Sequence, residues 1–392
     1  MEEWKEYKLG DVVNILDYKR VPLSSKERST RKGIFPYYGA QGIIDYIDDY
    51  IFDGTYLLIA EDGENLKSQK QNIAQLATGK YWVNNHAHIV ESNGLCDIRY
   101  LCYLLNTMDI SGYITGSAQP KLNQSNMSSI GLVLPSITIQ KRIADFLSCF
   151  DDKIEVNRRI NDNLEQQAQA LFKSWFVDFE PFKDQAFVES ELGMIPQGWK
   201  VCELSDLAEI SKVSINPFKQ PQTVFEHYSI PSYDNGMKPE IQLGEDIKSN
   251  KFFIENKMIL FSKLNPRIKR VWYVDHLGAN PVCSTEFVPY KAKDDSKSSF
   301  LYGLINGQGF YDFVMSMVNG ATGSHQRFHP EESLKYKVAY NEDYCEKYCT
   351  IITPMIKQIL EIRIESRRLA ELRDILLPKL MSGEINVNEV CI

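Results

Sequence analysis

The sequence predicts a mixed α/β (α+β) protein in which two globular modules are separated by two long antiparallel coiled-coil helices. Three observations predict this internal pseudo-two-fold repeat. A start motif occurs twice, an apolar heptad stripe occurs twice, and short strand-like runs alternate with turns between them. At 392 residues the chain is long enough for two or three domains.

The start motif marks where each repeat begins. Residues 3–15 read EWKEYKLGDVVNI, and residues 198–210 read GWKVCELSDLAEI. The shared residues lie 195 positions apart, so that Trp4, Leu9 and Asp11 recur as Trp199, Leu204 and Asp206.

The heptad stripe predicts the two long helices, because apolar residues spaced alternately by four and three form one seam of a coiled coil. The first stripe comprises Ile143, Leu147, Phe150, Ile154, Asn157, Asn161, Leu164, Ala168, Leu171 and Trp175. It recurs 205 positions later as Tyr348, Ile352, Met355, Ile359, Ile362, Ser366, Leu369, Arg373, Leu376 and Leu380. A helix of about 35 residues is about 50 Å long.

One such stripe normally packs on its own domain, but two matched stripes in one chain favour a mutual coiled coil. A chain whose halves close on each other runs these helices antiparallel. Asn157 and Asn161 then form a polar layer opposite Ile362 and Ser366, which can set the register of the two helices.

These elements divide the chain into five segments. They are a first module (1–139), a first helix (140–177), a connector (178–198), a second module (199–343), and a second helix with its tail (344–392). Prolines, glycines and acids in the connector predict an extended surface segment. Pro354 predicts a kink near the start of the second helix, and Pro378 an end or bend near its last turn.

Within the modules, short apolar runs predict a small twisted sheet. Residues 54–63 and 80–90 are each expected to form a strand, and residues 99–108 have helical spacing. In the second module, residues 300–318 are expected to form one helix.

Composition is ordinary for a globular protein, with 43% hydrophobic and 24% charged residues. No run of 18 apolar residues and no secretory signal occur, so we expect a cytoplasmic protein without a membrane span. Cys345 and Cys349 lie one helical turn apart, but no second pair with metal-ligand spacing accompanies them. Reduced thiols are therefore favoured over a zinc site.

The net charge of −8 weakly disfavours an acidic polymer as partner, but binding depends on where the charges lie. Two basic islands, residues 19–32 and 262–273, fall in different halves of the chain. The loops GSAQPKLN (116–123) and GSHQRFHP (323–330) each precede a heptad stripe and share Gly-Ser, Gln and a basic residue. Taken alone each loop could be a simple turn; taken with the repeat, the pair favours nucleic-acid contact.

Motifs for catalysis are weak. No phosphate-binding G-x-x-x-x-G-K-[ST] and no G-x-S-x-G occur. INPF (215–218) lacks one proline of the D/N-P-P-Y/F loop of adenine methyltransferases. Glu255 and Lys257 form an E-x-K of the kind that metal-dependent nucleases use, but this pattern arises easily and has no counterpart in the first half.

At this point the chain resembles the specificity (S) subunit of type I restriction-modification enzymes. The resemblance spans the whole chain and rests on the two W-x-x-x-x-L-x-D starts, the connector SELGMIPQGWKV (190–201), the loop-helix block at 116–182 and the ending LRDILLPKLMSGEI (372–385). The modules match only in general plan, as expected if they differ between members.

The resemblance implies that each module is a target recognition domain reading one half of a split, asymmetric site in double-stranded DNA. The helices act as a spacer and dock two modification (methyltransferase) subunits, which two restriction (translocase-nuclease) subunits can join. Such a subunit is not an enzyme and holds no cofactor or metal. Methyl donor, ATP and Mg are expected on the partner subunits.

Two groups of residues are candidates for these roles. For DNA binding we predict Arg31, Lys32, Tyr38, Gln41, Asn85, His86, Gln119, Lys121, Lys263, Arg267, Lys269, Arg270, Gln326 and Arg327. For the coiled-coil spacer we predict Ile143, Leu147, Phe150, Ile154, Leu164, Leu171, Ile352, Ile359, Ile362, Leu369 and Leu376. The alternatives are a coiled-coil interaction scaffold without a DNA role, and a nuclease or methyltransferase acting alone.

Overall fold

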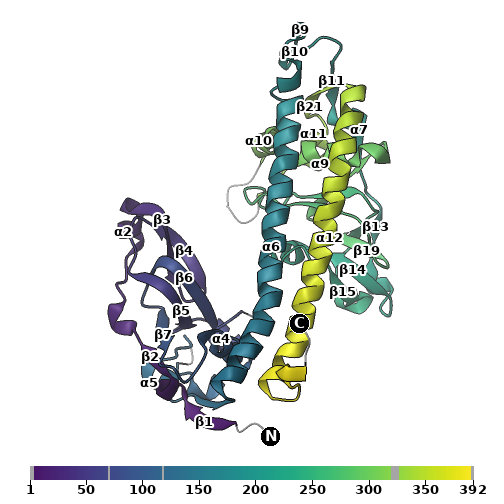
Figure 1. Cartoon of the computed structure of the whole chain (residues 1–392). Coiled ribbons are helices and arrows are strands. Elements are labelled where there is room, and N and C mark those ends of the chain that lie inside the picture. Colours follow the sequence, from purple (N-terminus) through teal and green to yellow (C-terminus); the bar gives the residue numbers. More distant parts are fainter. Residues whose placement is uncertain (1–3, 69–70, 117–118, 319–325, 390–392) are drawn as a thin grey trace. The chain divides into compact units, whose positions relative to one another are not determined.

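A computed structural model of the chain describes residues 4–68, 71–116, 119–318 and 326–389. The chain divides into two compact units. The first unit combines Met1–Glu155 with Ser366–Ile392, and the second is Val156–Glu365. Each unit therefore contains one module and a part of each long helix (Figure 1).

The first module is built on a six-stranded sheet in the order β2-β7-β5-β6-β3-β4, antiparallel except for the pair β3 and β6. Its elements are β1 (Lys5–Lys8), α1 (Leu9–Val12), β2 (Val13–Ile15), η1 (Asp17–Lys19), α2 (Ser25–Thr30), β3 (Lys32–Gly39), β4 (Gly42–Ile47), β5 (Phe52–Ala60), α3 (Asn65–Ser68), β6 (Ala74–Val83), β7 (Ala87–Ser92), α4 (Ile98–Thr107), η2 (Ser111–Tyr113), α5 (Gln124–Ser128) and β8 (Gly131–Leu134). The predicted strand at 54–63 and helix at 99–108 are confirmed as β5 and α4, whereas residues 80–90 belong to two strands, β6 and β7.

The second module has a four-stranded sheet in the order β12-β20-β17-β18 and a five-stranded sheet in the order β13-β16-β19-β14-β15. Its elements are β11 (Lys200–Glu203), α7 (Leu204–Leu207), β12 (Ala208–Ile210), β13 (Ser214–Ile215), η4 (Pro217–Lys219), β14 (Val224–Tyr228), α8 (Ile230–Asp234), β15 (Glu240–Leu243), η5 (Gly244–Asp246), β16 (Lys251–Phe253), β17 (Met258–Ser262), β18 (Val271–Val274), β19 (Pro281–Ser284), β20 (Phe287–Ala292), η6 (Asp295–Lys297), α9 (Ser298–Ile305), α10 (Gln308–Ser316), α11 (Pro330–Ser333) and β21 (Lys337–Tyr340). The single helix expected at 300–318 is thus wrong, because Gly307 separates α9 from α10 with an extended backbone.

The repeated start motif folds identically in both units. Strand, short helix and strand follow one another as β1-α1-β2 and as β11-α7-β12. At the start of each short helix an aspartate carboxylate accepts a backbone N–H three residues earlier, Asp11 from Lys8 and Asp206 from Glu203, both at 3.0 Å. The predicted duplication is therefore confirmed at the level of hydrogen bonds.

The two tryptophans of the motif also have matching surroundings. The indole of Trp4 lies against Gly383, which follows the second long helix. The indole of Trp199 packs against Phe176 and Phe182 at the end of the first long helix, with ring centroids 5.6 and 5.1 Å apart. Each start motif therefore contacts the end of a long helix.

The two long helices are α6 (Ile137–Phe176) and α12 (Glu342–Met381), of 40 residues each. Within the second unit Asn157 on α6 pairs with Glu365 on α12, and the carbonyl of Ala168 on α6 accepts a hydrogen bond from Tyr348 on α12. Since residue numbers rise along one helix as they fall along the other, the predicted antiparallel pairing is confirmed (Figure 1). The helix α12 continues through Pro354 without interruption and ends three residues after Pro378.

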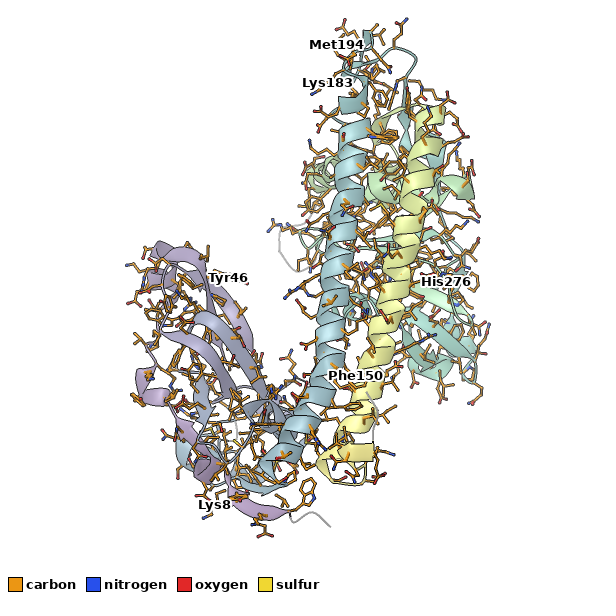
Figure 2. All side chains as sticks on the ribbon, in the orientation of Figure 1. Lys8, Tyr46, Phe150, Lys183, Met194 and His276 are labelled. Carbon is orange, nitrogen blue, oxygen red and sulfur yellow. The ribbon has the colours of Figure 1, made fainter. Side chains whose placement is uncertain are left out.

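The predicted seam faces the interior to different degrees along its length. Ile143, Leu147, Ile352 and Ile359 are buried, and Phe150 (labelled in Figure 2), Ile154, Leu164, Leu171, Ile362, Leu369 and Leu376 are partly buried. The polar layer is present: Asn157 and Asn161 are 1% and 9% exposed. The same helix faces also close the modules' cores, because Leu147 and Leu380 belong to the core of the first unit.

The connector is folded, which corrects the expectation of an extended segment. It forms the turn η3 (Glu180–Phe182) and a hairpin of β9 (Phe187–Ser190) and β10 (Gly193–Pro196). Phe182 and Ile195 are buried in the core of the second unit, whereas Met194, labelled in Figure 2, is 56% exposed. Aromatic packing with Trp199 therefore overrides the linker-like composition.

Candidate nucleic-acid interface

In the first unit, a turn at the end of β5 collects segments that are distant in the sequence. The backbone N–H of Glu61 donates to the carbonyl of His86 (2.9 Å), and the carbonyl of Glu61 accepts from Leu122 (2.8 Å). Gln41 reaches the same turn through a side-chain hydrogen bond to Asn65 (3.1 Å). The structure thus brings together five of the predicted residues, all exposed: Gln41, Asn85, His86, Gln119 and Lys121.

The side chains around this turn offer both donors and acceptors. The ammonium of Lys121, 54% exposed, lies 3.3 Å from the carboxylate of Glu61. The ring of His86 lies 2.7 Å from the carboxylate of Asp62. Such a mixed set of exposed polar groups matches the donors and acceptors on base edges better than a uniformly basic patch does.

The other three predicted residues of the first unit have partners within the fold. Arg31 pairs with Asp48 (2.9 Å) and lies over the ring of Trp82, and Lys32 pairs with Asp45 (2.6 Å). The ring of Tyr38 packs edge-on against a buried tyrosine, and burial raises the pKa of its hydroxyl. Since Lys32 begins β3 and Gln41 follows the end of that strand, the backbone of Lys32 lies roughly 25 Å along the strand from Gln41. Arg20, at the start of the same basic island, instead pairs with Glu61 at the turn.

The second unit repeats this arrangement at the end of β17. The strand registers pair Ala60 with Ala87 and Ser262 with Phe287, so Lys263 takes the place of Glu61 and Glu286 that of His86. The backbone N–H of Lys263 accordingly donates to the carbonyl of Glu286 (2.9 Å).

The loop before the second heptad stripe also reaches this turn. The carbonyl of Gln326 accepts from the backbone N–H of Asn265 (2.9 Å), and Arg327 makes two hydrogen bonds to Glu286 (3.0 and 2.9 Å). Lys121 and Arg327 each stand two residues before the residue that caps a short helix. Lys121 and Arg327 are therefore equivalent positions. The sequence had aligned Gln119 with Gln326, and the structure shifts that alignment by one residue. Residues 117–118 and 323–325 of these loops lie outside the described part of the chain.

In the loop from Lys263 to Arg270, some basic side chains face solvent and others form hydrogen bonds within the fold that anchor the loop. Arg267 is exposed at the tip, and Lys263 is half-buried. The ammonium of Lys269 donates to the carbonyl of Asn306 (2.5 Å), and burial lowers the pKa of that ammonium. Arg270 is 8% exposed and makes two hydrogen bonds to Asp234 (2.7 and 2.8 Å), so the structure gives it an anchoring role.

Comparison with known proteins gives this geometry a context. A family model described as "Type I restriction modification DNA specificity domain" matches residues 1–166, which cover the first module and most of α6. The chain is 27% identical to the type I restriction enzyme MjaIX specificity subunit of Methanocaldococcus jannaschii, over 99% of this chain and 98% of that protein. It is 25% identical to the type I restriction enzyme HindI specificity subunit of Haemophilus influenzae, over 98% of this chain and 100% of that protein.

Residues 1–166 thus match the type I restriction-modification DNA specificity domain, and the chain as a whole is similar to type I restriction-enzyme specificity subunits. The crystal structure of the S subunit of a type I restriction-modification system from M. genitalium shares the fold of this chain, with a TM-score of 0.60 at 14% identity. The likeness covers 97% of this chain and 96% of that one.

Sequence reasoning missed several residues that shape the turn at the end of β5. Arg20 donates to the carboxylate of Glu61 (2.7 Å) and lies 3.3 Å from that of Asp17. His88, 1% exposed, hydrogen-bonds Asp17 and the carbonyl of Leu122. No local signal identifies this network, because its members come from four segments of the chain.

No helix in the described ranges combines the length and the apolar character needed to cross a bilayer.

Proposed function

We propose that this chain is a type I specificity subunit that recognises a split, asymmetric DNA sequence. Each module reads one half-site through the turn at the end of its central strand. The observation that carries the proposal is the repeated constellation of three ionisable residues, each exposed or partly buried, on each module. In the first module they are Glu61, His86 and Lys121, and in the second Lys263, Glu286 and Arg327.

These residue types fit direct readout of bases. Lysine and arginine donate to the O6 and N7 atoms of guanine, and carboxylates accept from the N4 amino group of cytosine. The two modules carry different residue types at two of the three equivalent positions, since Lys263 replaces Glu61 and Glu286 replaces His86. Different bases should therefore be selected by the two modules, which gives an asymmetric target.

Assembly follows from the same proposal. We assign the helices α6 and α12 to spacing the modules and to docking two modification subunits, which two restriction subunits join. Exposed apolar side chains on these helices support a docking role: Val156, Ile160, Leu372 and Ile375 are 48%, 36%, 50% and 59% exposed. Catalysis, methyl donor, ATP and Mg are assigned to the partner subunits, and the assembly to the cytoplasm, where its DNA substrate lies. Since the chain carries a net charge of −8, partner subunits would also supply much of the phosphate contact.

Mapping of methylated positions tests the proposal. The chain is co-expressed with the modification subunits, and DNA exposed to the complex is sequenced for methylated bases. We expect methylation within one two-part motif, with a spacer of fixed length. Methylation without a sequence motif would refute the proposed DNA recognition. So would a chain that assembles with the modification subunits but does not direct them to DNA, and the chain would then be a scaffold only. Methylation or cleavage by the purified chain alone would establish an enzyme.

A further inference from the structure

His88 lies in β7 beneath the turn of the first unit and is almost completely buried. Its Nδ1 atom is 2.5 Å from a carboxylate oxygen of Asp17, and its Nε2 atom is 2.8 Å from the backbone carbonyl of Leu122. The ring therefore bridges the segment after β2 and the loop that carries Gln119 and Lys121.

The protons of this bridge follow from its partners. A backbone carbonyl only accepts hydrogen bonds, so Nε2 must donate. Asp17 also accepts from the backbone N–H of Ile89 (2.9 Å) and lies 3.3 Å from the guanidinium of Arg20, an environment that keeps a carboxylate ionised. Although burial alone would raise the pKa of Asp17, the hydrogen bonds from His88 and Ile89 lower it. The ring thus has a hydrogen-bond acceptor at each nitrogen, a carboxylate at Nδ1 and a backbone carbonyl at Nε2.

The bridge extends to the exposed turn. Arg20 donates to the carboxylate of Glu61 (2.7 Å) and to the carbonyl of Ala87 (3.0 Å), and Glu61 lies 3.3 Å from the ammonium of Lys121. The buried and the exposed parts are thus one chain of charge-assisted hydrogen bonds, which are stronger and more directional than neutral ones.

The second unit has no equivalent bridge at this position. The strand registers pair Ile59 with His88 and Phe261 with Val288, so a buried valine takes the place of the histidine. The loop of the second unit is instead held by Arg327 on Glu286, an exposed ion pair. A defect at position 88 should therefore be confined to the first module.

We propose that His88 is a positioning residue that fixes the loop carrying Gln119 and Lys121 against the end of β5, and so sets the base selectivity of the first module. The inference rests on the proposed function of this loop in DNA reading. His88 itself is buried and contacts no base.

The test compares His88→Gln with His227→Gln, a half-buried histidine in the second unit whose Nδ1 atom is 2.8 Å from Gln242. Glutamine can replace only one of the two hydrogen bonds of His88. In the complex with modification subunits, methylation rates are measured on duplexes carrying single base changes in either half-site. We expect His88→Gln to lower discrimination at least about tenfold in one half-site and leave the other unchanged. His227→Gln should leave that first half-site at wild-type selectivity.

A second measurement needs no DNA. Hydrogen exchange of the free chain should speed up at the backbone amides of Lys121 and Leu122 in His88→Gln, with the amides of β17 and β20 unchanged. Asp17→Asn keeps the imidazole of His88 but weakens the acceptor at its Nδ1 atom. It should speed up exchange at the same amides to a smaller extent, and it provides the test if His88→Gln does not fold.

The outcomes separate the two proposals. A wild-type complex without any sequence preference would refute the proposed function and this inference with it. A selective wild type together with unchanged selectivity and unchanged exchange in the variants would overturn the role of His88 alone. Equal loss of selectivity in both half-sites would also overturn it, because it would indicate general destabilisation.

Discussion

Asn161 on α6 donates its side-chain amide to the backbone carbonyl of Ile359 on α12, at 3.3 Å. One turn earlier, Asn157 donates to the carboxylate of Glu365 at 2.8 Å. Two polar residues of α6 thus interrupt the mainly apolar seam between the helices. Buried polar groups in a coiled coil fix the register of the helices at some expense of stability.

We expect Asn161→Leu to raise the free energy of unfolding by about 1 kcal/mol, because the buried Oδ1 atom of Asn161 has no hydrogen-bond partner among the described residues. The reverse exchange at an apolar seam position, Ile352→Asn, should lower it by about 3 kcal/mol, since Ile352 is fully buried. Urea unfolding measures both values. Destabilisation of similar size in both variants would contradict this prediction, because it would show that the hydrogen bonds of Asn161 stabilise the fold.

Arg267 and Arg270 provide a matched pair within one loop. Arg267→Ala should leave stability unchanged but weaken DNA binding by the complex and reduce the salt slope by about 1, because its exposed guanidinium is free to neutralise a phosphate. Arg270→Ala should lower the free energy of unfolding by about 1–2 kcal/mol, because it removes a buried group and leaves Asp234 without its partner. Salt titrations of binding and urea unfolding separate the two effects. An unchanged salt slope in Arg267→Ala would remove this loop from the interface.

Gly383 adopts a left-handed backbone with φ of 74°, and a Cβ atom there would lie 3.0 Å from the indole of Trp4. Gly198 has a similar φ of 88°, but no atom lies within 4 Å of its Cβ position. We therefore expect Gly198→Ala to cost about 1 kcal/mol from backbone strain alone and Gly383→Ala about 2 kcal/mol. Thermal unfolding measures the difference, and equal costs would mean that Trp4 moves aside freely.

Asp17 should make the stability of the first unit sensitive to acid. Burial raises the pKa of this carboxyl, but hydrogen bonds from His88 and Ile89 lower it overall from its ordinary value of 3.8. A carboxylate with a lowered pKa stabilises the folded chain above its ordinary pKa, and this contribution is lost as the pH falls through the folded-state value. The wild type should therefore exceed Asp17→Asn in stability at pH 7, and the difference should shrink below about pH 4. Urea unfolding across this range gives the difference, and a constant one would contradict the assignment.

The sequence predicted features whose signal is local. The heptad stripe indicated α6 and α12 within a few residues of their bounds, because apolar spacing along one helix determines which face is buried. The start motifs were recognisable because Asp11 and Asp206 cap short helices three residues from their partners. The hairpin at 187–196 was missed because its stability comes from aromatic packing around Trp199, which composition does not report.

The candidate site was predicted in part for the same reason. Exposed polar loops such as that of Gln119 and Lys121 can be recognised from the repeat. The sequence does not show which basic residues already have a partner within the fold. Arg270 pairs with Asp234, for example, and the two are 36 residues apart in the chain. The pair of His88 and Asp17 was not predicted, because the two residues are 71 positions apart and become neighbours only through the pairing of β7 with β2.

The discontinuity of the first unit bears on the order in which the chain can fold during synthesis. Residues 366–389 contribute Leu380 and Met381 to the core built by residues before 156. On the ribosome these partners emerge only after the whole second unit, whose residues have all been synthesised by position 365. Part of the apolar surface of the N-terminal module therefore stays uncovered until α12 has been translated. A nascent chain stalled before residue 366 should present that surface to chaperones.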